Sequence, residues 1–127
     1  MFRWSSHRLQ FGSELMLRLR IGSVSVDSGQ IIIVDPCYLR DFESNEYERD
    51  IKQIGNFSYS GSCNTTQTPE SAGPLDHSDI FGHTFPAAVA SSTGYGDGEY
   101  EVFATYTADD RIAKLEIIFI KGESTDV

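Results

Sequence analysis

The sequence predicts a mainly β fold: a small antiparallel β-sandwich or partly open barrel with at most one short helix. Three observations support this. Apolar and polar residues alternate over several segments, which is typical of strands with one buried face. The run Ile31–Val34 consists of β-branched residues, which favour extended backbone. Breaks rich in Gly, Ser and Asp separate these segments, as tight connections do in small β folds.

The clearest alternation lies near the C-terminus. One face of the first strand is apolar: Tyr100, Val102, Ala104 and Tyr106. After a polar connection at 107–110, the return strand 111–120 is apolar at Ala113, Leu115, Ile117 and Phe119. A slip of one residue would move every apolar side chain to the wrong face. The pattern therefore predicts a hairpin with a well-defined register.

A second hairpin is predicted at residues 23–34. Residues 23–26 alternate, Gly29 supplies a positive φ for the turn, and Ile31–Val34 returns as a buried strand. Pro36 ends it because it lacks an N–H. Further strands are predicted at Glu14–Ile21, Gly55–Ser60 and Ala87–Ser91.

One short helix is predicted at 44–55, where Ser44 suits the N-cap and Gly55 the end. Residues 61–86 lack periodicity and are expected to form a long loop. The chain is predicted to be a single domain, 1–127, because its length suits one core. Its ends are an N-terminal arm or terminal strand at 1–15 and a frayed tail at 121–127.

Charge and composition exclude several classes of protein. Ten Lys and Arg against 19 Asp and Glu give a net charge of −9, which excludes general binding to nucleic acids or anionic membranes. The longest apolar runs are four residues, too short to span a bilayer. No signal peptide is visible, and two Cys do not make a disulfide framework, so a reduced cytoplasmic setting is expected. The oligomeric state is not indicated.

The first polar cluster, Asp35, Cys37 and Tyr38, directly follows the predicted buried strand. A strand end is a rigid place from which to present ligand-binding side chains. Cys37 is a nucleophile only if a base such as His77 or His83 lowers its pKa. The plainer interpretation is a small buried thiol beside a strand-ending Pro. A Cys37–Cys63 disulfide is a further alternative that nothing in the sequence favours.

The second cluster is glycine-rich: Gly94, Tyr95, Gly96, Asp97 and Gly98, followed by Tyr100. It is not a phosphate loop, because neither Lys-Ser nor Lys-Thr follows, and its acidic spacing is wrong for an EF-hand. One interpretation is a ligand-facing or cation-binding loop with Asp97 as acceptor. The other is a tight architectural corner in which Asp97 bonds local backbone N–H groups.

The third cluster is His77, Asp79 and His83, inside the expected long loop. These residue types ligate zinc or manganese, and a divalent cation is the only cofactor that the sequence suggests. Spacing on an irregular loop constrains the geometry little, so solvent-facing side chains are the alternative interpretation.

Several separated motifs resemble those of a known group. They are Val-Asp-Ser-Gly-Gln at 26–30, Asp-Pro-Cys-Tyr at 35–38, Phe-Ser-Tyr at 57–59 and Thr-Gly-Tyr-Gly-Asp-Gly-x-Tyr at 93–100. The chain resembles a family of small uncharacterised bacterial and phage proteins with the pattern VDSGQ…DPCY…STGYGDGxYxVxxxY, roughly from Ile21 to Phe119. The resemblance implies a cytoplasmic prokaryotic or viral accessory protein, and it transfers no catalytic role.

Three functions follow as hypotheses. The first is a non-enzymatic module that binds a small ligand or cation through the first two clusters, for example to sequester a host signalling molecule. The second is an acidic, inhibitor-like subunit for a basic protein partner, since residues 53–110 contain no Lys or Arg. The third, and least favoured, is a small hydrolase that uses Asp35, Asp97 and His83.

Overall fold

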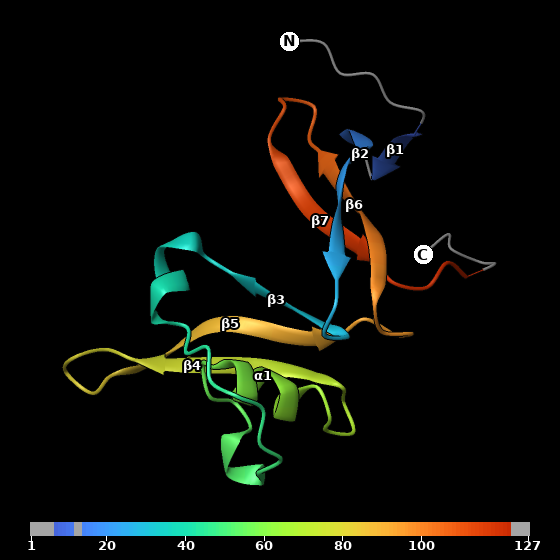
Figure 1. The fold of residues 1–127 in the computed structure, drawn as a ribbon. Helices are drawn as coiled ribbons and strands as arrows, with labels where there is room; N and C mark the ends of the chain where they lie inside the picture. The colour runs from blue at the N-terminus through green and yellow to red at the C-terminus, as the bar shows by residue number, and fades with distance from the viewer. Residues whose placement is uncertain (1–6, 12–13, 123–127) are drawn as a thin grey trace. The chain divides into compact units, whose positions relative to one another are not determined.

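The structure is a computed structural model that describes residues 7–11 and 14–122, and within these ranges it is mainly β with one short α-helix (Figure 1). The predicted fold class is confirmed, and neither sheet closes into a barrel. The elements are β1 (His7–Phe11), β2 (Glu14–Val26), β3 (Gln30–Val34), α1 (Tyr59–Thr65), β4 (Ala72–Ser78), β5 (Thr84–Ser92), β6 (Gly98–Tyr106) and β7 (Ile112–Ile118).

The chain divides into two compact units, each described here by itself. Unit 1 comprises Met1–Ser25 and Gly98–Val127, and unit 2 comprises Val26–Asp97. Unit 1 contains a four-stranded sheet in the order β1-β2-β6-β7, and unit 2 contains a three-stranded sheet in the order β3-β5-β4. The single domain expected over 1–127 stays a prediction.

The first described element of unit 1 is a strand. β1 pairs antiparallel with β2, with Phe11 opposite Glu14. The other predictions for residues 1–6, 12–13 and 123–127 lie outside the described residues.

The predicted C-terminal hairpin is confirmed as β6 and β7, with Ala104 opposite Leu115. Its polar turn is closed by a hydrogen bond of 3.1 Å from the N–H of Arg111 to Oγ1 of Thr107. On β2, the guanidinium of Arg18 lies 3.8 Å from the ring centroid of Phe103. The same guanidinium donates to Glu116 on β7 at 2.8 Å. This contact ties three strands of the sheet together.

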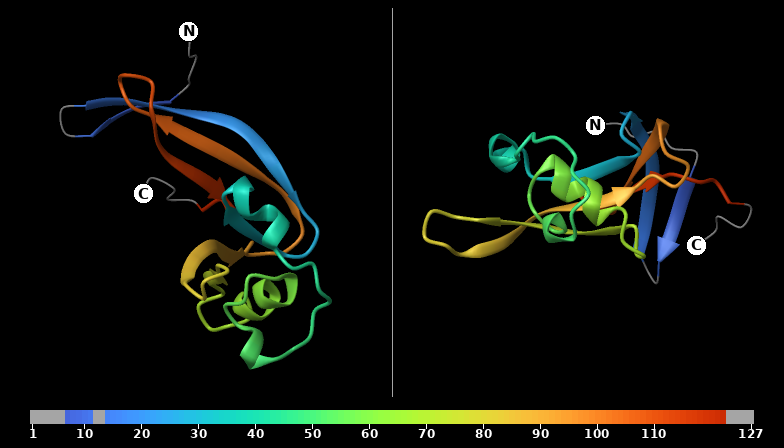
Figure 2. Two further views of the ribbon diagram at one scale, coloured as in Figure 1. Left: turned by 90° about the vertical axis from the view of Figure 1, so that its left-hand side faces the viewer. Right: turned by 60° about the horizontal axis from the view of Figure 1, so that its bottom comes forward.

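Unit 2 builds its core on one face of its sheet. The core residues are Phe57, Leu75, Ala87, Ala88 and Ala90, with Ile32, Val34, Tyr38, Phe42 and Phe85 packed against them. Small alanines on β5 leave room for aromatic rings that come from the connecting segments. α1 contacts all three strands of this sheet, and Figure 2 shows it beside the sheet in two further views.

The predicted hairpin at 23–34 is wrong, although both strands exist. β2 lies in the sheet of unit 1, whereas β3 pairs with β5, with Ile32 opposite Ala90. Gly29 does take a positive φ of 69°. The turn at Gly29 connects a strand of the unit 1 sheet to a strand of the unit 2 sheet, so it does not join two paired strands. The period of two identifies a strand but not its partner.

The predictions for residues 44–86 are also wrong. Residues 44–55 contain a single 3-10 turn, Ile51–Gln53, which begins where the Asp50 side chain accepts from the N–H of Lys52 at 2.9 Å. In place of the strand expected at 55–60, α1 begins at Tyr59, because Ser58 Oγ accepts from the N–H of Gly61 at 2.8 Å. The expected loop at 61–86 contains most of α1, all of β4 and the start of β5.

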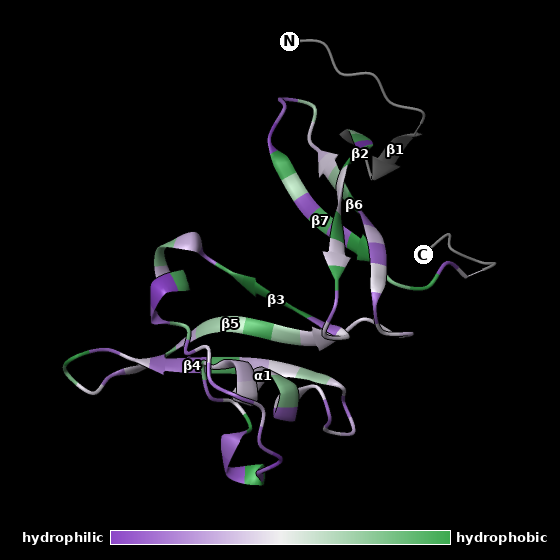
Figure 3. Cartoon of the chain, viewed as in Figure 1, coloured by the Kyte–Doolittle hydropathy of each residue, from purple (hydrophilic) through white to green (hydrophobic). Residues whose placement is uncertain are grey.

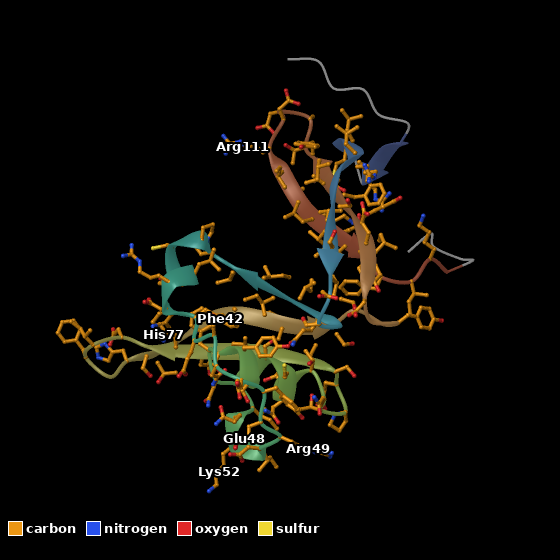
Figure 4. All side chains as sticks on the ribbon, in the orientation of Figure 1. Phe42, Glu48, Arg49, Lys52, His77 and Arg111 are labelled. Carbon is orange, nitrogen blue, oxygen red and sulfur yellow. The ribbon has the colours of Figure 1, made fainter. Side chains whose placement is uncertain are left out.

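The sequence pattern did not predict α1, because its residues are small and polar although they are buried. Side-chain hydrogen bonds, rather than apolar contacts, account for this burial. Asn64 donates to the carbonyl of Glu48 at 2.8 Å and accepts from the N–H of Asp50 at 3.0 Å. Ser60 also bonds the main chain of Glu48, and Thr65 accepts from the N–H of Gly55 at 2.8 Å. The helix therefore holds the wrapped segment 43–56, where Figure 4 labels Glu48. A buried polar helix of this kind has no hydrophobic period to detect.

Candidate functional site

In the first predicted cluster, Asp35 caps a 3-10 turn and Tyr38 packs against the core of unit 2. The Asp35 carboxylate accepts from the N–H of Cys37 at 2.9 Å and starts the 3-10 turn Pro36–Asp41. Cys37 is exposed. Tyr38 packs its ring on Phe85, with centroids 5.2 Å apart. Asp35 and Tyr38 thus have structural contacts that account for them without a ligand.

The glycine-rich cluster forms a corner beside Gly29. Thr93 is buried and joins the two segments: its N–H donates to the Gly29 carbonyl at 3.2 Å, and its hydroxyl donates to the carbonyl of Gly96. Gly94 and Gly96 take positive φ values of 77° and 101°, which an L side chain rarely adopts. The corner exposes Tyr95 and Asp97.

The structure does not bring these two clusters together. Asp35 follows the last residue of β3, whereas the corner packs beside Gly29, just before its first residue. Five extended residues separate the two ends by about 17 Å. Gly98 and Tyr100 belong to unit 1, where Tyr100 packs edge-on against Phe119 at 5.5 Å.

The predicted metal ligands are also dispersed. His77, labelled in Figure 4, lies among aromatic rings, with its ring centroid 5.4 Å from that of Phe57 and 5.6 Å from that of Phe85. Its Nε2 is 3.5 Å from a carboxylate oxygen of Asp41. His83 instead pairs with Asp79 at 3.4 Å. Among residues 7–11 and 14–122, no three His, Cys, Asp or Glu side chains gather closely enough to hold a metal ion.

Both cysteines are free, and their surroundings differ. Cys63 is buried on α1 and accepts from the side-chain amide of Gln30 at 3.0 Å. A hydrogen bond between Tyr59 and Cys63 raises the pKa of the Tyr59 phenol, and burial adds to this. The other end of the Gln30 amide accepts from Ser62. These contacts fix the position of α1 against the start of β3.

The tip of the β4–β5 hairpin carries two residues that the sequence analysis did not single out. Ile80 is 93% exposed and Phe81 is 76% exposed. In Figure 3 this tip is coloured as hydrophobic at the end of a polar strand. The Asp79 carboxylate accepts from the N–H groups of Phe81 and His83, each at 2.9 Å, and so fixes the turn between the strands. The signal that could have found it is Asp-x-x-Gly at 79–82, a turn sequence next to apolar residues.

The described part of unit 2 has hollows on its surface, of which two are considered. One, of about 270 Å³, is lined by residues of the 49–54 segment and of 64–69. The other, of about 170 Å³, lies at β3 and is lined by Ser28, Gln30, Ile31, Ile32, Phe42, Tyr59 and Ser62. Both are smaller than the roughly 300–1,000 Å³ of usual small-molecule sites.

Comparison with known proteins gives a family. Residues 19–117 match the family described as Protein of unknown function (DUF4241). The chain belongs to this family. No curated protein and no solved structure matches the chain.

The DUF4241 match runs from within β2 to within β7, so it includes all of unit 2 and strands from both segments of unit 1. β1 lies outside the matched residues. The uncharacterised family that the sequence analysis expected is confirmed at this level. Within the part of the DUF4241 chain that the structure describes, no helix has the length and apolar character needed to cross a membrane.

Proposed function

We propose that the protein is an acidic protein-binding module that docks on a basic protein partner through unit 2. The observation that carries this proposal is the β4–β5 hairpin tip, which presents Ile80 and Phe81 to solvent on a turn held by Asp79. Exposed apolar residues on an ordered turn are typical of interaction sites.

The tip is organised before any partner arrives. Asp79 accepts three hydrogen bonds that close the turn. Two end on its carboxylate, and the third, of 3.0 Å from the N–H of Gly82, ends on its carbonyl. Gly82 takes a positive φ of 82°, which favours glycine at this position. A rigid turn loses little conformational entropy on binding, so more of the contact energy with Phe81 contributes to affinity.

Charge selects the kind of partner. Unit 2 contains 11 Asp and Glu against three Lys and Arg. The hairpin itself has acidic Asp76 and Asp79 and belongs to the stretch 53–110 that lacks Lys and Arg. Such a surface repels nucleic acids and anionic lipids and accelerates the approach of a basic protein.

The small-ligand or cation-binding function has less structural support. The residues predicted to bind the ligand lie at opposite ends of β3 or in unit 1. The hollow at β3 has room for about one side chain. A thermal-shift panel of divalent cations and nucleotides separates the two functions. A ligand at 100 times its dissociation constant would add about 2.7 kcal/mol of stability and favour the ligand-binding function. We expect no such shift.

The direct test identifies a partner from the hairpin tip. A photo-crosslinking residue at position 81 captures the partner, which is then purified and titrated against the full chain by calorimetry. Phe81→Ser should weaken binding at least tenfold, because truncating an anchor residue of an interface typically costs about 2 kcal/mol or more. Tyr95→Ser is the matched control, since Tyr95 is 83% exposed but lies at the glycine corner.

Salt completes the test. For the wild-type chain, affinity should fall as salt rises from about 0.05 to 0.5 M, because ions screen attraction between exposed charges. An acidic partner, or an equal loss of affinity in the Phe81 and Tyr95 variants, would contradict the proposal.

A further inference from the structure

The outer edge of β3 has main-chain groups that pair with no described residue. Among the described strands, β3 pairs only with β5, and the bond from Thr93 N–H to the Gly29 carbonyl fixes which residues face that strand. Hydrogen-bonded and non-hydrogen-bonded pairs alternate in an antiparallel ladder. Gln30, Ile32 and Val34 therefore direct their N–H and C=O groups away from β5. Within the described ranges, none of these three residues makes a further main-chain hydrogen bond.

The opposite edge of the same sheet is closed. On β4, Pro74 has no N–H to offer, and the N–H of Asp76 donates to the Gly55 carbonyl at 2.8 Å. Proline and covering loops are the usual means by which proteins protect sheet edges. The chain protects β4 in this way and leaves β3, with its sequence Gln-Ile-Ile-Ile-Val, open.

The open edge has an adjacent hollow on the core face of the sheet. Its walls include Ile32, the ring of Phe42, and Tyr59 on α1, and its volume is about 170 Å³. On the outer face, Ile33 is 61% exposed beside Val89 of β5, which is 48% exposed. An added strand would have apolar surface for its side chains on both faces of the sheet.

We propose that the outer edge of β3 binds an extended, basic segment of the protein partner by strand addition, with one apolar side chain of that segment in the hollow beside Phe42. This inference rests on the proposed function and adds to it the form in which the partner binds. Main-chain bonds to Ile32 provide affinity, and the hollow selects the side chain.

Charge favours a basic segment over a second copy of this chain. The carboxylates Asp27 and Asp35 flank the ends of β3, and Glu43 is the residue after Phe42, which lines the hollow. Arg40, on the nearby 3-10 turn, is the one basic side chain of residues 26–48. Pairing two copies through β3 would bring like charges together in a chain of net charge −9.

Amide hydrogen exchange of the free full-length chain is the first measurement. The Ile32 amide should exchange at least tenfold faster than the Ile33 amide, which faces β5. Slow exchange at Ile32 at every protein concentration would mean that another part of this chain covers the edge. Slow exchange only at high concentration would mean that a second copy covers it. Either result would overturn the inference.

The second measurement adds the peptide Ac-Val-Lys-Val-Lys-Val-Lys-Val-NH₂ as the probe. It should slow exchange at Ile32 at least tenfold and leave Ile33 unchanged. Two matched peptides carry N-methyl groups on either the Val or the Lys residues, with charge conserved. Only one of them should lose binding, because a single edge of the peptide pairs with β3.

Equal binding of both methylated peptides, without protection of Ile32, would indicate charge attraction alone. That result would overturn strand addition but leave the proposed function standing, because partner capture at position 81 tests that separately. Absence of any peptide binding would also overturn the inference.

A pair of variants locates the site. Ser28 is exposed and lines the hollow, so Ser28→Trp should fill it without disturbing the core and abolish the peptide-induced protection of Ile32. Ala108→Trp, on the exposed turn between β6 and β7, is the control and should bind as the wild type does. Unchanged protection in the Ser28 variant would place the peptide elsewhere.

Discussion

Helix α1 and the β6–β7 hairpin reverse the usual relation between polarity and burial. The helix has the sequence Tyr-Ser-Gly-Ser-Cys-Asn-Thr, and every residue after its first is buried. In contrast, β7 has apolar residues in a regular alternation, yet Leu115 is 59% exposed and Ala113 is exposed as well. Polar residues are thus packed inside one region while apolar residues face solvent in the other.

The difference shows that side-chain hydrogen bonds can bury a segment as effectively as apolar contacts. The side chains of Ser60, Asn64 and Thr65 satisfy main-chain groups of the 48–55 segment, which has little regular structure of its own. A buried polar group without such a partner would cost about 1–3 kcal/mol. The segment and the helix therefore stabilise each other, whereas the hairpin is defined by its register.

The largest expected effect comes from crowding the helix. A Cβ on Gly61 would lie 2.0 Å from the carbonyl oxygen of Asn56, so Gly61→Ala must displace main chain. We expect a loss of about 3 kcal/mol, at the upper end for overpacked sites. Gly22→Ala on β2 is the control, since nothing lies within 4 Å of its Cβ position. Urea unfolding measures both, and comparable losses would show that the close packing of α1 is not special.

The second effect comes from removing the bonds that bury the helix. Asn64→Ala leaves the N–H of Asp50 without its partner and removes one of the two hydrogen bonds to the carbonyl of Glu48, which should cost about 2 kcal/mol. The exposed Asn56, whose side chain donates to Gln53, is the control, and Asn56→Ala should change stability by less than about 0.5 kcal/mol. If the Asn64 variant unfolds at the same urea concentration as the wild type, the segment is held by other contacts.

The same contrast explains what the sequence could predict. The register of β6 and β7 followed from alternation alone, because local patterning determines a hairpin with a short turn. The pairing of β3 with β5 did not, since more than 50 residues separate Ile32 from Ala90 and several strands have suitable patterns. α1 was missed because its stability comes from bonds to a distant loop rather than from helical periodicity.

For the candidate site, the sequence indicated the glycine corner and the turn at Asp35. It did not indicate that the two lie apart in the fold. Adjacent motifs suggested one site, whereas β3 holds Asp35 and Gly29 at opposite ends. Exposure of Ile80 and Phe81 also could not be predicted from periodicity, because it depends on which residues the finished hairpin leaves uncovered.

A third prediction concerns the polar contact that holds the hairpin. The hydrogen bond from Arg18 keeps the pKa of Glu116 below its ordinary value of 4.5. The pair therefore stabilises the fold fully above that pH, and its contribution is lost as pH falls through the lowered pKa. Glu116→Gln should lower stability by about 0.5–1 kcal/mol at pH 7, because the pair is partly exposed. The difference from the wild type should shrink as the pH falls below 4.5.

Urea unfolding at pH 3 and pH 7 checks this prediction, with the exposed Glu46→Gln as the control. The control should match the wild type at both values. A difference between the Glu116 variant and the wild type that does not shrink between pH 7 and pH 3 would mean that packing, rather than charge, makes the contact.

The smallest effect is expected where the pattern is most regular. Leu115→Thr keeps a residue that favours strands at a position that is 59% exposed, so stability should change by less than about 0.5 kcal/mol. Leu75→Thr, at a fully buried position on β4, should cost about 3 kcal/mol because it opens a cavity and buries a hydroxyl. Thermal unfolding of both variants measures the contrast. A loss above 1.5 kcal/mol for the Leu115 variant would mean that β7 buries its apolar face in solution. The alternation of apolar residues in β7 would then indicate a buried face, as it does in most strands.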